Sequence, residues 1–278
     1  MKKYVLLMFC LVTAACATSP TGRRQLMMVD DSSIAPQAAL SFEQMKKKEK
    51  VSNKPAVSAY VQCIVEPLVN EAREQYPNLP ANWETIVFDS DTVNAFAMPG
   101  GKVGVYTGLI DLTENQDQLA AVLGHEIGHV MAHHAAERLS TAQMTVLAMT
   151  AAGVALSRNQ DQAIIMAALG IGAQIGIQLP FSRVHESEAD QIGEELMAKA
   201  GFDPAQSIRL WELMEKGGGA RPPELLSTHP DPMNRAQRLN GFLPQTEVMY
   251  QNALKSGKHP RCVMPKKPTT TEMKKEAR

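Results

Sequence analysis

Two histidines four residues apart, His125 and His129, enclose a glutamate in the pattern His-Glu-x-x-His. Residues four apart lie on one face of a helix, so both imidazoles can reach one metal ion. Glu126 follows His125 directly and therefore projects to one side of the ligand pair. There it can hold a zinc-bound water molecule and accept its proton as the water attacks a peptide carbonyl. The spacing predicts a catalytic zinc site with Glu126 as general base.

A catalytic zinc ion needs a third protein ligand and an open fourth position. Glu186 and Asp190 are four residues apart and share a face of a predicted helix, so we expect Glu186 to bind the metal. Asp190 would then accept a hydrogen bond from a ligating imidazole. Glu188 is the rival ligand, although it lies off the shared face, and an isolated acidic cluster is by default only solvated. The sequence predicts one zinc ion per chain, held by His125, His129 and Glu186.

The predicted helix that carries this pattern has a regular apolar face and a capping-box start, Thr113 with Gln116. Its apolar residues are Leu119, Val122, Leu123, Ile127 and Val130. Gly128 allows close packing against a neighbour. Burying two histidines and a glutamate without a metal ion would leave polar groups that are costly to satisfy.

The remaining elements predict an α+β fold that is mainly helical. Further helices are expected over 35–50, 56–75 with Pro67 kinking or dividing it, 183–200, 204–216 and 232–240. Short strands are expected over 83–88, 93–98 and 102–107, the last two joined by a turn at 99–101. This is the only clear β region, so we expect a small, largely antiparallel sheet beside the zinc-binding helix.

Length and composition favour one catalytic domain with short appendages. The chain has 278 residues and a formal net charge of -1, and 5% of its residues are aromatic. A nucleic-acid partner is therefore not expected. We divide the chain into a signal peptide (1–15), a polar, irregular tether (16–34), a peptidase domain (35–262) and a disordered tail (263–278).

The N-terminus has the pattern of an export signal. Two lysines precede a short apolar run over 4–12, and Ala14 and Ala15 stand before Cys16. Small residues before a cysteine resemble a bacterial lipobox, which predicts lipidation of Cys16. An ordinary signal peptide cut near Ala17 is the alternative, and the apolar run is too short to span a bilayer.

Two cysteines remain after this assignment, because Cys10 lies in the signal and Cys16 carries the lipid. In an oxidising compartment Cys63 and Cys262 are then expected to form a disulfide. Two free thiols are the alternative.

Taken together, His125-Glu126-x-x-His129 and the downstream Glu186-x-x-x-Asp190 resemble the gluzincin metallopeptidases related to HtpX and the CAAX-processing endopeptidase. The resemblance covers about residues 20–240. Asn94-Ala95-Phe96-Ala97 resembles the family's substrate-side strand, and Val103 with Tyr106-Thr107-Gly108-Leu109 resembles the strand and turn that lead to its zinc helix. Ser227-Thr228-His229-Pro230 with Arg235 resembles its late His-Pro motif. Residues 21–26 resemble the mature N-terminus of its lipoprotein members. The chain most resembles the small, lipoprotein-type, periplasmic members.

The resemblance implies a zincin-type catalytic domain that cleaves unfolded or damaged envelope proteins from a lipid anchor, with the outer membrane favoured. An extended substrate would lie along Asn94–Ala97. His229 and Arg235 would donate hydrogen bonds to the developing oxyanion. The alternative is that His229 caps a short helix and that Arg235 pairs with Asp190 or Glu186.

Two other functions stay open. One is a zinc-stabilised, chaperone-like binding protein, and the other is an integral membrane protease with spans at 142–157 and 163–181. We interpret 144–181 rather as a mobile cover over the site. Of the other histidines, His133 and His134 are expected to be structural or at the surface, and His185 and His259 are expected at the surface.

Overall fold

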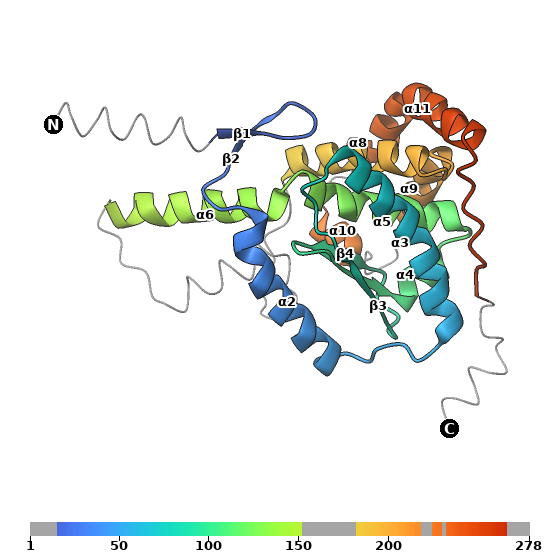
Figure 1. The fold of residues 1–278 in the computed structure, drawn as a ribbon, viewed down its shortest axis with the longest axis horizontal. Coiled ribbons are helices and arrows are strands. Elements are labelled where there is room, and N and C mark those ends of the chain that lie inside the picture. The colour runs from blue at the N-terminus through green and yellow to red at the C-terminus, as the bar shows by residue number, and fades with distance from the viewer. Residues whose placement is uncertain (1–15, 152–181, 218–223, 230–231, 266–278) are drawn as a thin grey trace.

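A three-stranded sheet in the order β3-β5-β4 lies beside the helix that carries the His-Glu-x-x-His pattern (Figure 1). This computed structural model describes residues 16–151, 182–217, 224–229 and 232–265. The strands are β3 (Glu84–Phe88), β4 (Ala95–Met98) and β5 (Lys102–Tyr106). Helices predominate among the described residues, so the predicted mainly helical α+β class is confirmed.

The predicted antiparallel sheet is only partly correct. β4 and β5 form an antiparallel hairpin, whose turn uses Gly100 and Gly101 at positive φ. β3 instead pairs with β5 in parallel, with Glu84 opposite Lys102. The chain crosses from β3 to the far edge and returns through the centre, so the first and third strands become neighbours. Alternation of apolar residues predicts strands but does not specify their order in a sheet.

The two faces of the sheet pack against different helices. Val87, Val103 and Val105 belong to the main core with α3 (Pro55–Gln75) and α5 (Gln116–Met131). Phe88 and Met98 face the opposite side and join a smaller core with α2 (Asp31–Lys48). Each strand therefore buries both faces, which fixes the sheet against the central helix α5.

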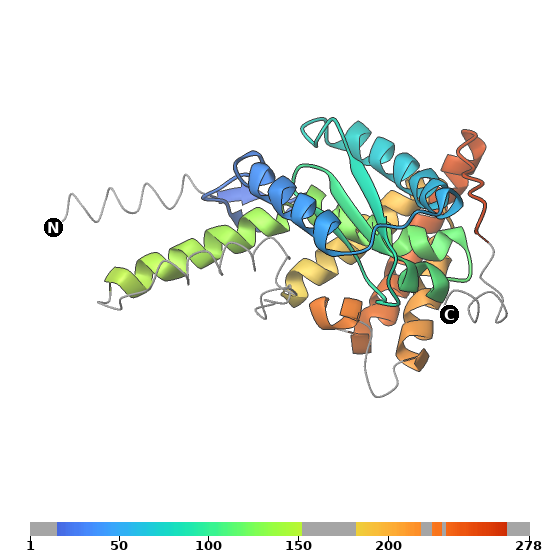
Figure 2. The same ribbon diagram turned by 90° about the horizontal axis from the view of Figure 1, so that it is seen from below.

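Helix α5 is the centre of the domain, and nearly all of its side chains are buried. It packs closely along α8 (Arg183–Lys199), which is covered in turn by α11 (Pro232–Lys255), while α9 (Ala205–Gly217) packs against α11 and α5 (Figures 1 and 2). The contact is close because glycines meet in it. A Cβ built on Gly193 of α8 would lie 2.6 Å from the backbone nitrogen of His125.

Several helices begin or end at other residues than the sequence predicts. Thr113 does not cap the zinc helix: it follows α4 (Thr107–Leu112), and its hydroxyl donates to the Ile110 carbonyl. Asn115 is the N-cap of α5, and its side chain accepts from the Gln118 N–H. α3 continues through Pro67 without dividing.

At the end of the chain α11 runs on to Lys255, past the predicted stop at Gly241. A Cβ built on Gly241 would meet no heavy atom within 4 Å, so the helix faces open space at this position.

The segment predicted as an irregular tether is ordered. β1 (Cys16–Thr18) pairs antiparallel with β2 (Arg24–Leu26), and Gly22 takes positive φ in the connecting turn. Arg23 and Gln25 then bond to α6 (His134–Ala151) at Glu137. Local patterns do not reveal this ordered hairpin, because the contacts that hold it against α6 join residues more than 100 positions apart.

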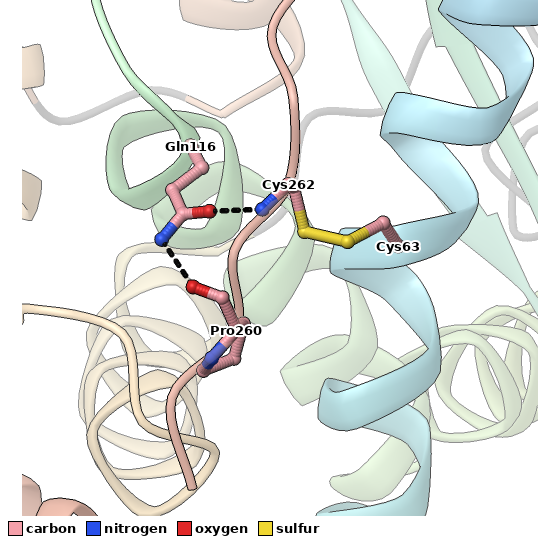
Figure 3. Close-up of a disulfide and its surroundings, with 4 residues drawn as sticks. All are labelled: Cys63, Gln116, Pro260 and Cys262. Carbon is pink, nitrogen blue, oxygen red and sulfur yellow. Dashed lines mark hydrogen bonds between the residues drawn. A yellow bond between two sulfur atoms is a disulfide. The ribbon is translucent and has the colours of Figure 1, made fainter.

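The predicted disulfide is present between Cys63 of α3 and Cys262, with 5.7 Å between the Cα atoms (Figure 3). The Gln116 side chain donates to the Pro260 carbonyl at 2.8 Å and accepts from the Cys262 N–H at 2.7 Å. The C-terminal segment is thus fixed to both α3 and the start of α5.

Within the described part of the chain, no helix combines the length and apolar character required to cross a bilayer. Most of the expected cover, or paired spans, over 144–181 lies outside the described residues, as do the signal peptide and most of the expected tail.

Candidate metal centre

Helix α5 places the two predicted histidine ligands one turn apart at its buried C-terminal end. The Nε2 atoms of His125 and His129 lie 3.0 Å from each other. Both side chains are less than 7% exposed. The structure thus brings the two predicted ligand side chains together at one point.

Glu186 of α8 reaches the same point. Its carboxylate oxygens lie 3.4 Å from His125 Nε2 and 3.5 Å from His129 Nε2. His229, at the end of α10 (Glu224–Thr228), joins them, with its Nδ1 at 3.2 Å from His125 Nε2 and 3.0 Å from Glu186 Oε1. Ligand atoms from all four residues lie within 4.8 Å of one another.

This donor set fits a zinc ion. A histidine that binds a metal through Nε2 presents a lone pair there, and two such lone pairs 3.0 Å apart would repel each other without a cation between them. Three imidazoles and a carboxylate are typical zinc ligands. Burial opposes ionisation of Glu186, yet the neighbouring histidines hold its pKa well below the usual range, so the carboxylate is negative and ready to bind a cation.

Glu126 lies beside the cluster without being part of it. Its Oε1 is buried, 3.4 Å from His229 Nε2, and makes no hydrogen bond among the described residues. Burial raises the pKa of this carboxyl. A carboxylate with spare acceptor capacity and a raised pKa is suited to take up a proton and return it.

A buried set of ion pairs supports the ligands from behind. His125 Nδ1 lies 2.9 Å from Oδ1 of Asp190, the carboxylate expected to face a ligating imidazole. Asp190 Oδ2 accepts from Arg235 Nε at 2.8 Å, and Arg235 also donates to Glu186. The guanidinium lies over the Trp211 ring, 4.0 Å from its centroid. The structure therefore supports the alternative in which Arg235 pairs with carboxylates that hold the site.

The late His-Pro motif reaches the cluster through α10. The Leu225 N–H donates to the Val93 carbonyl at 3.2 Å, and the His229 N–H donates to the Leu225 carbonyl at 3.0 Å. His229 therefore sits next to the segment that leads into β4. Its ring can act as a hydrogen-bond donor, and in this position it can equally serve as a fourth metal ligand.

The expected substrate strand is the edge strand β4 beside α5. Ala95 and Ala97 face the main core, whereas Phe96 packs among Phe42, Phe88 and Tyr106 on the other face. Asn94 is buried, and its side chain accepts from the Ala95 N–H at 2.9 Å. Among the described residues one edge of β4 has no strand partner.

Two of the remaining histidines are buried. For His134 this agrees with the structural alternative, whereas the expectation that His185 lies at the surface is wrong. His134 is fully buried and contacts His129, and its ring stacks on that of His185, 4.3 Å between centroids. His185 Nε2 lies 3.1 Å from Glu137 Oε2. Glu188, considered above as the rival ligand, bonds to His134 and not to the metal cluster.

The sequence held a signal for this second group, since His134-x-x-Glu137 and His185-x-x-Glu188 repeat one spacing. The other two histidines fit the expectation better: His133 is half-buried and pairs with Asp31, and His259 is exposed.

The chain is similar in sequence to known metallopeptidases, as expected for a protein with such a centre. The model of peptidase family M48 matches residues 55–242. The mitochondrial metalloendopeptidase OMA1 of Schizosaccharomyces pombe is 38% identical over 175 residues, 62% of this chain and 50% of its own length. OMA1 of Bos taurus is 34% identical over 242 residues, 81% of this chain and 45% of its own.

A bacterial relative also matches. The β-barrel assembly-enhancing protease of Escherichia coli is 31% identical over 218 residues, 73% of this chain and 44% of its own length. The chain thus spans about half the length of these curated relatives. Their names differ from HtpX and the CAAX-processing endopeptidase, to which the motifs first pointed.

Proposed function

Because the chain belongs to peptidase family M48, we propose that it is a zinc-dependent endopeptidase that cleaves unfolded or damaged proteins. The convergence of His125, His129 and Glu186 on one point, with Glu126 beside it, carries this proposal. A site that only held a structural ion would need no buried carboxylate with spare acceptor capacity next to it. When bound, zinc would supply Lewis acidity that lowers the pKa of a water molecule and polarises the peptide carbonyl.

The side chains then have separate tasks. Glu126 accepts a proton from the attacking water at its carboxylate and returns it to the leaving amine. Asp190 fixes the ring of His125 through Nδ1, and Arg235 holds Asp190 and Glu186 together. Because these supports are fully buried, the ligands keep their arrangement without rearranging during turnover.

An unfolded chain suits the free edge of β4. A substrate strand added beside Ala95–Met98 would be recognised mainly through its backbone, which requires an extended segment and little side-chain specificity. The adjacency of β4 to α5 would bring the scissile bond toward the cluster.

His229 lies where its ring can either donate a hydrogen bond to the substrate or bind the metal as a fourth ligand. As a donor it would stabilise negative charge on the carbonyl oxygen, the role we propose. It would have to present Nε2 to the substrate, since its Nδ1 lies within 3.2 Å of His125 and Glu186 atoms.

We further propose that the mature protein is anchored by lipid at Cys16 on the periplasmic side of the outer membrane. The small residues before Cys16 support lipidation, and the disulfide between Cys63 and Cys262 suits an oxidising compartment. The bacterial relative named for β-barrel assembly favours the same envelope location. Cell fractionation of Cys16→Ser tests the anchor, because the variant should leave the membrane fraction and a fully membrane-bound variant would refute it.

The second candidate function is a zinc-stabilised binding protein that holds unfolded chains without cutting them. Digestion of unfolded casein separates the two. We expect cleavage that a zinc chelator abolishes and added zinc restores. Casein that stays intact in the presence of one bound zinc ion per chain would favour the binding protein.

A further inference from the structure

A second group of buried polar side chains adjoins the metal centre. It contains His134 and Glu137 of α6 and His185 and Glu188 of α8, and it is joined by Arg23 of the N-terminal hairpin, whose side chain is 24% exposed. Arg23 Nη2 lies 2.6 Å from Glu137 Oε2 and 2.7 Å from Glu188 Oε2. The hairpin thus contributes a cation to a group whose other members belong to α6 and α8.

His134, Glu137 and His185 are close enough together to hold a metal ion of their own. The guanidinium of Arg23 already lies between the two carboxylates, and Gln25 donates to Glu137 Oε2 at 2.8 Å. A divalent cation at the same oxygens would face this fixed positive charge at close range. The group is therefore better explained as a hydrogen-bonded network than as a second metal site.

One member of the network contacts a ligand of the proposed zinc ion. His129 Nδ1 and His134 Nδ1 lie 2.8 Å apart, and His134 Nε2 lies 3.1 Å from Glu188 Oε2. The chain can bring His134 back onto His129 because His133 between the two helices takes a left-handed conformation, φ 55°. His129, His134 and Glu188 therefore form a row of three hydrogen-bonded side chains that leads away from the metal centre.

The protons in this row can be placed from the chemistry of imidazole alone. A neutral His129 that binds metal through Nε2 carries its proton on Nδ1 and donates it. His134 Nδ1 must then accept, which leaves the proton of His134 on Nε2, facing Glu188. A carboxylate at Glu188 is the matching acceptor. The donor and acceptor roles are consistent from the metal to the carboxylate.

We propose that Glu188 is a positioning residue for the metal ligand His129, acting through His134, and that the N-terminal hairpin holds Glu188 in place through Thr21 and Arg23. The inference rests on the proposed zinc site. It gives a function to residues for which the mechanism above has no use.

The hairpin supplies the contacts that keep Glu188 an acceptor. Thr21 Oγ1 donates to Glu188 Oε1 at 2.5 Å, and Arg23 Nε donates to Oε2 at 2.8 Å. Thr21, Arg23 and His134 Nε2 all lie against the two Glu188 oxygens, so the carboxylate acts as the acceptor at the end of these hydrogen bonds.

Such outer partners fix the orientation of a ligating imidazole and raise its basicity, and their loss typically costs about 10- to 100-fold in metal affinity. We expect Glu188→Gln to weaken zinc binding by this factor, measured by competition with a chromophoric chelator on the full chain. The visible absorption of the Co²⁺-substituted protein should change as well, because the His129 ring loses its fixed direction.

Glu137→Gln is the matched control. Glu137 bonds to Arg23 and Gln25 of the same hairpin and to His185, whereas Glu188 bonds to His134. This variant should loosen the hairpin comparably and keep the zinc dissociation constant within about threefold of wild type, well below the roughly 10- to 100-fold loss expected when an outer partner is removed.

His134→Asn provides a second, independent test. The amide oxygen of asparagine can take the place of His134 Nδ1 and accept from His129 without any partner at Glu188. In this background Glu188→Gln should no longer change zinc affinity, a coupling that a purely structural role would not produce.

The inference is overturned if Glu188→Gln binds zinc as tightly as wild type, if Glu137→Gln weakens binding equally, or if the effect of Glu188→Gln persists in the His134→Asn background. A wild-type chain that binds no zinc would instead remove the proposed function, and this inference with it.

Discussion

Replacement of Gly193 by alanine should separate the two helices that supply the metal ligands. A Cβ at this position would lie 2.6 Å from His125 N and 2.8 Å from His125 Cα. Both neighbours are backbone atoms of α5, which cannot move aside as a flexible side chain could. The shortest contact falls 0.8 Å below the 3.4 Å at which ordinary van der Waals contact begins. α8 must therefore move away from α5 or tilt by about this amount.

The displacement acts on the site because Glu186 is on α8 and the histidine ligands are on α5. Metal–ligand distances are held to within about 0.2 Å, so a shift several times larger cannot be absorbed at the cluster. We expect Gly193→Ala to lower zinc affinity more than about tenfold, since it acts on the ligand set directly where an outer partner alone costs 10- to 100-fold. Overpacking should also lower the free energy of unfolding of the metal-free chain by about 1–3 kcal/mol.

Chelator competition and thermal melting of the metal-free protein measure these two effects. Gly241→Ala is the matched control, because it makes the same change inside α11, where no heavy atom lies within 4 Å of the added Cβ. It should leave zinc affinity unchanged and stabilise the chain by up to about 1 kcal/mol. If Gly193→Ala keeps the wild-type zinc affinity and melting temperature, the reasoning from helix contact to ligand geometry is refuted.

Three other perturbations have definite expected results. Burial raises the pKa of Glu194 to about 8, above its ordinary value of 4.5, so this group should cost stability as pH rises from about 4.5 to about 8. Glu194→Gln should accordingly melt above wild type at pH 8 but not at pH 4, and identical profiles would contradict this. Reduction of the Cys63–Cys262 disulfide, which joins residues 199 positions apart, should lower the free energy of unfolding by up to about 5 kcal/mol in the chain-entropy model; an unchanged denaturation midpoint would argue against it. His229→Ala should reduce turnover by about a hundredfold or more with one zinc ion still bound, as for the loss of an oxyanion donor. Turnover equal to or above that of wild type would show that His229 is not the oxyanion donor.

The parts of the site that follow local rules were predictable from the sequence. Helical spacing brings His125 and His129 together, and the same spacing relates Glu186 to Asp190. The β4–β5 hairpin follows from its Pro-Gly-Gly turn. In each case the information lies within a few residues.

The remaining features depend on contacts between distant segments. Arg23 and Glu188 are separated by 165 positions, and no local pattern relates them. The row from His129 to His134 requires left-handed backbone at His133, a conformation that is uncommon outside glycine and that periodicity does not reveal. The helix contact at Gly193 was not predictable either. A glycine within a helical pattern indicates only a weaker helix, and it does not show which segment packs against it.

Digestion of unfolded casein by wild type and by Glu126→Gln, with the zinc content of each protein measured in the same preparation, tests the central claim most directly. Glu126 is not one of the residues that converge to hold the ion, so the variant should keep one zinc ion per chain and lose proteolysis. Cleavage by the zinc-loaded variant at the wild-type rate would contradict the assignment of Glu126 as the base, and with it the catalytic mechanism proposed for this centre.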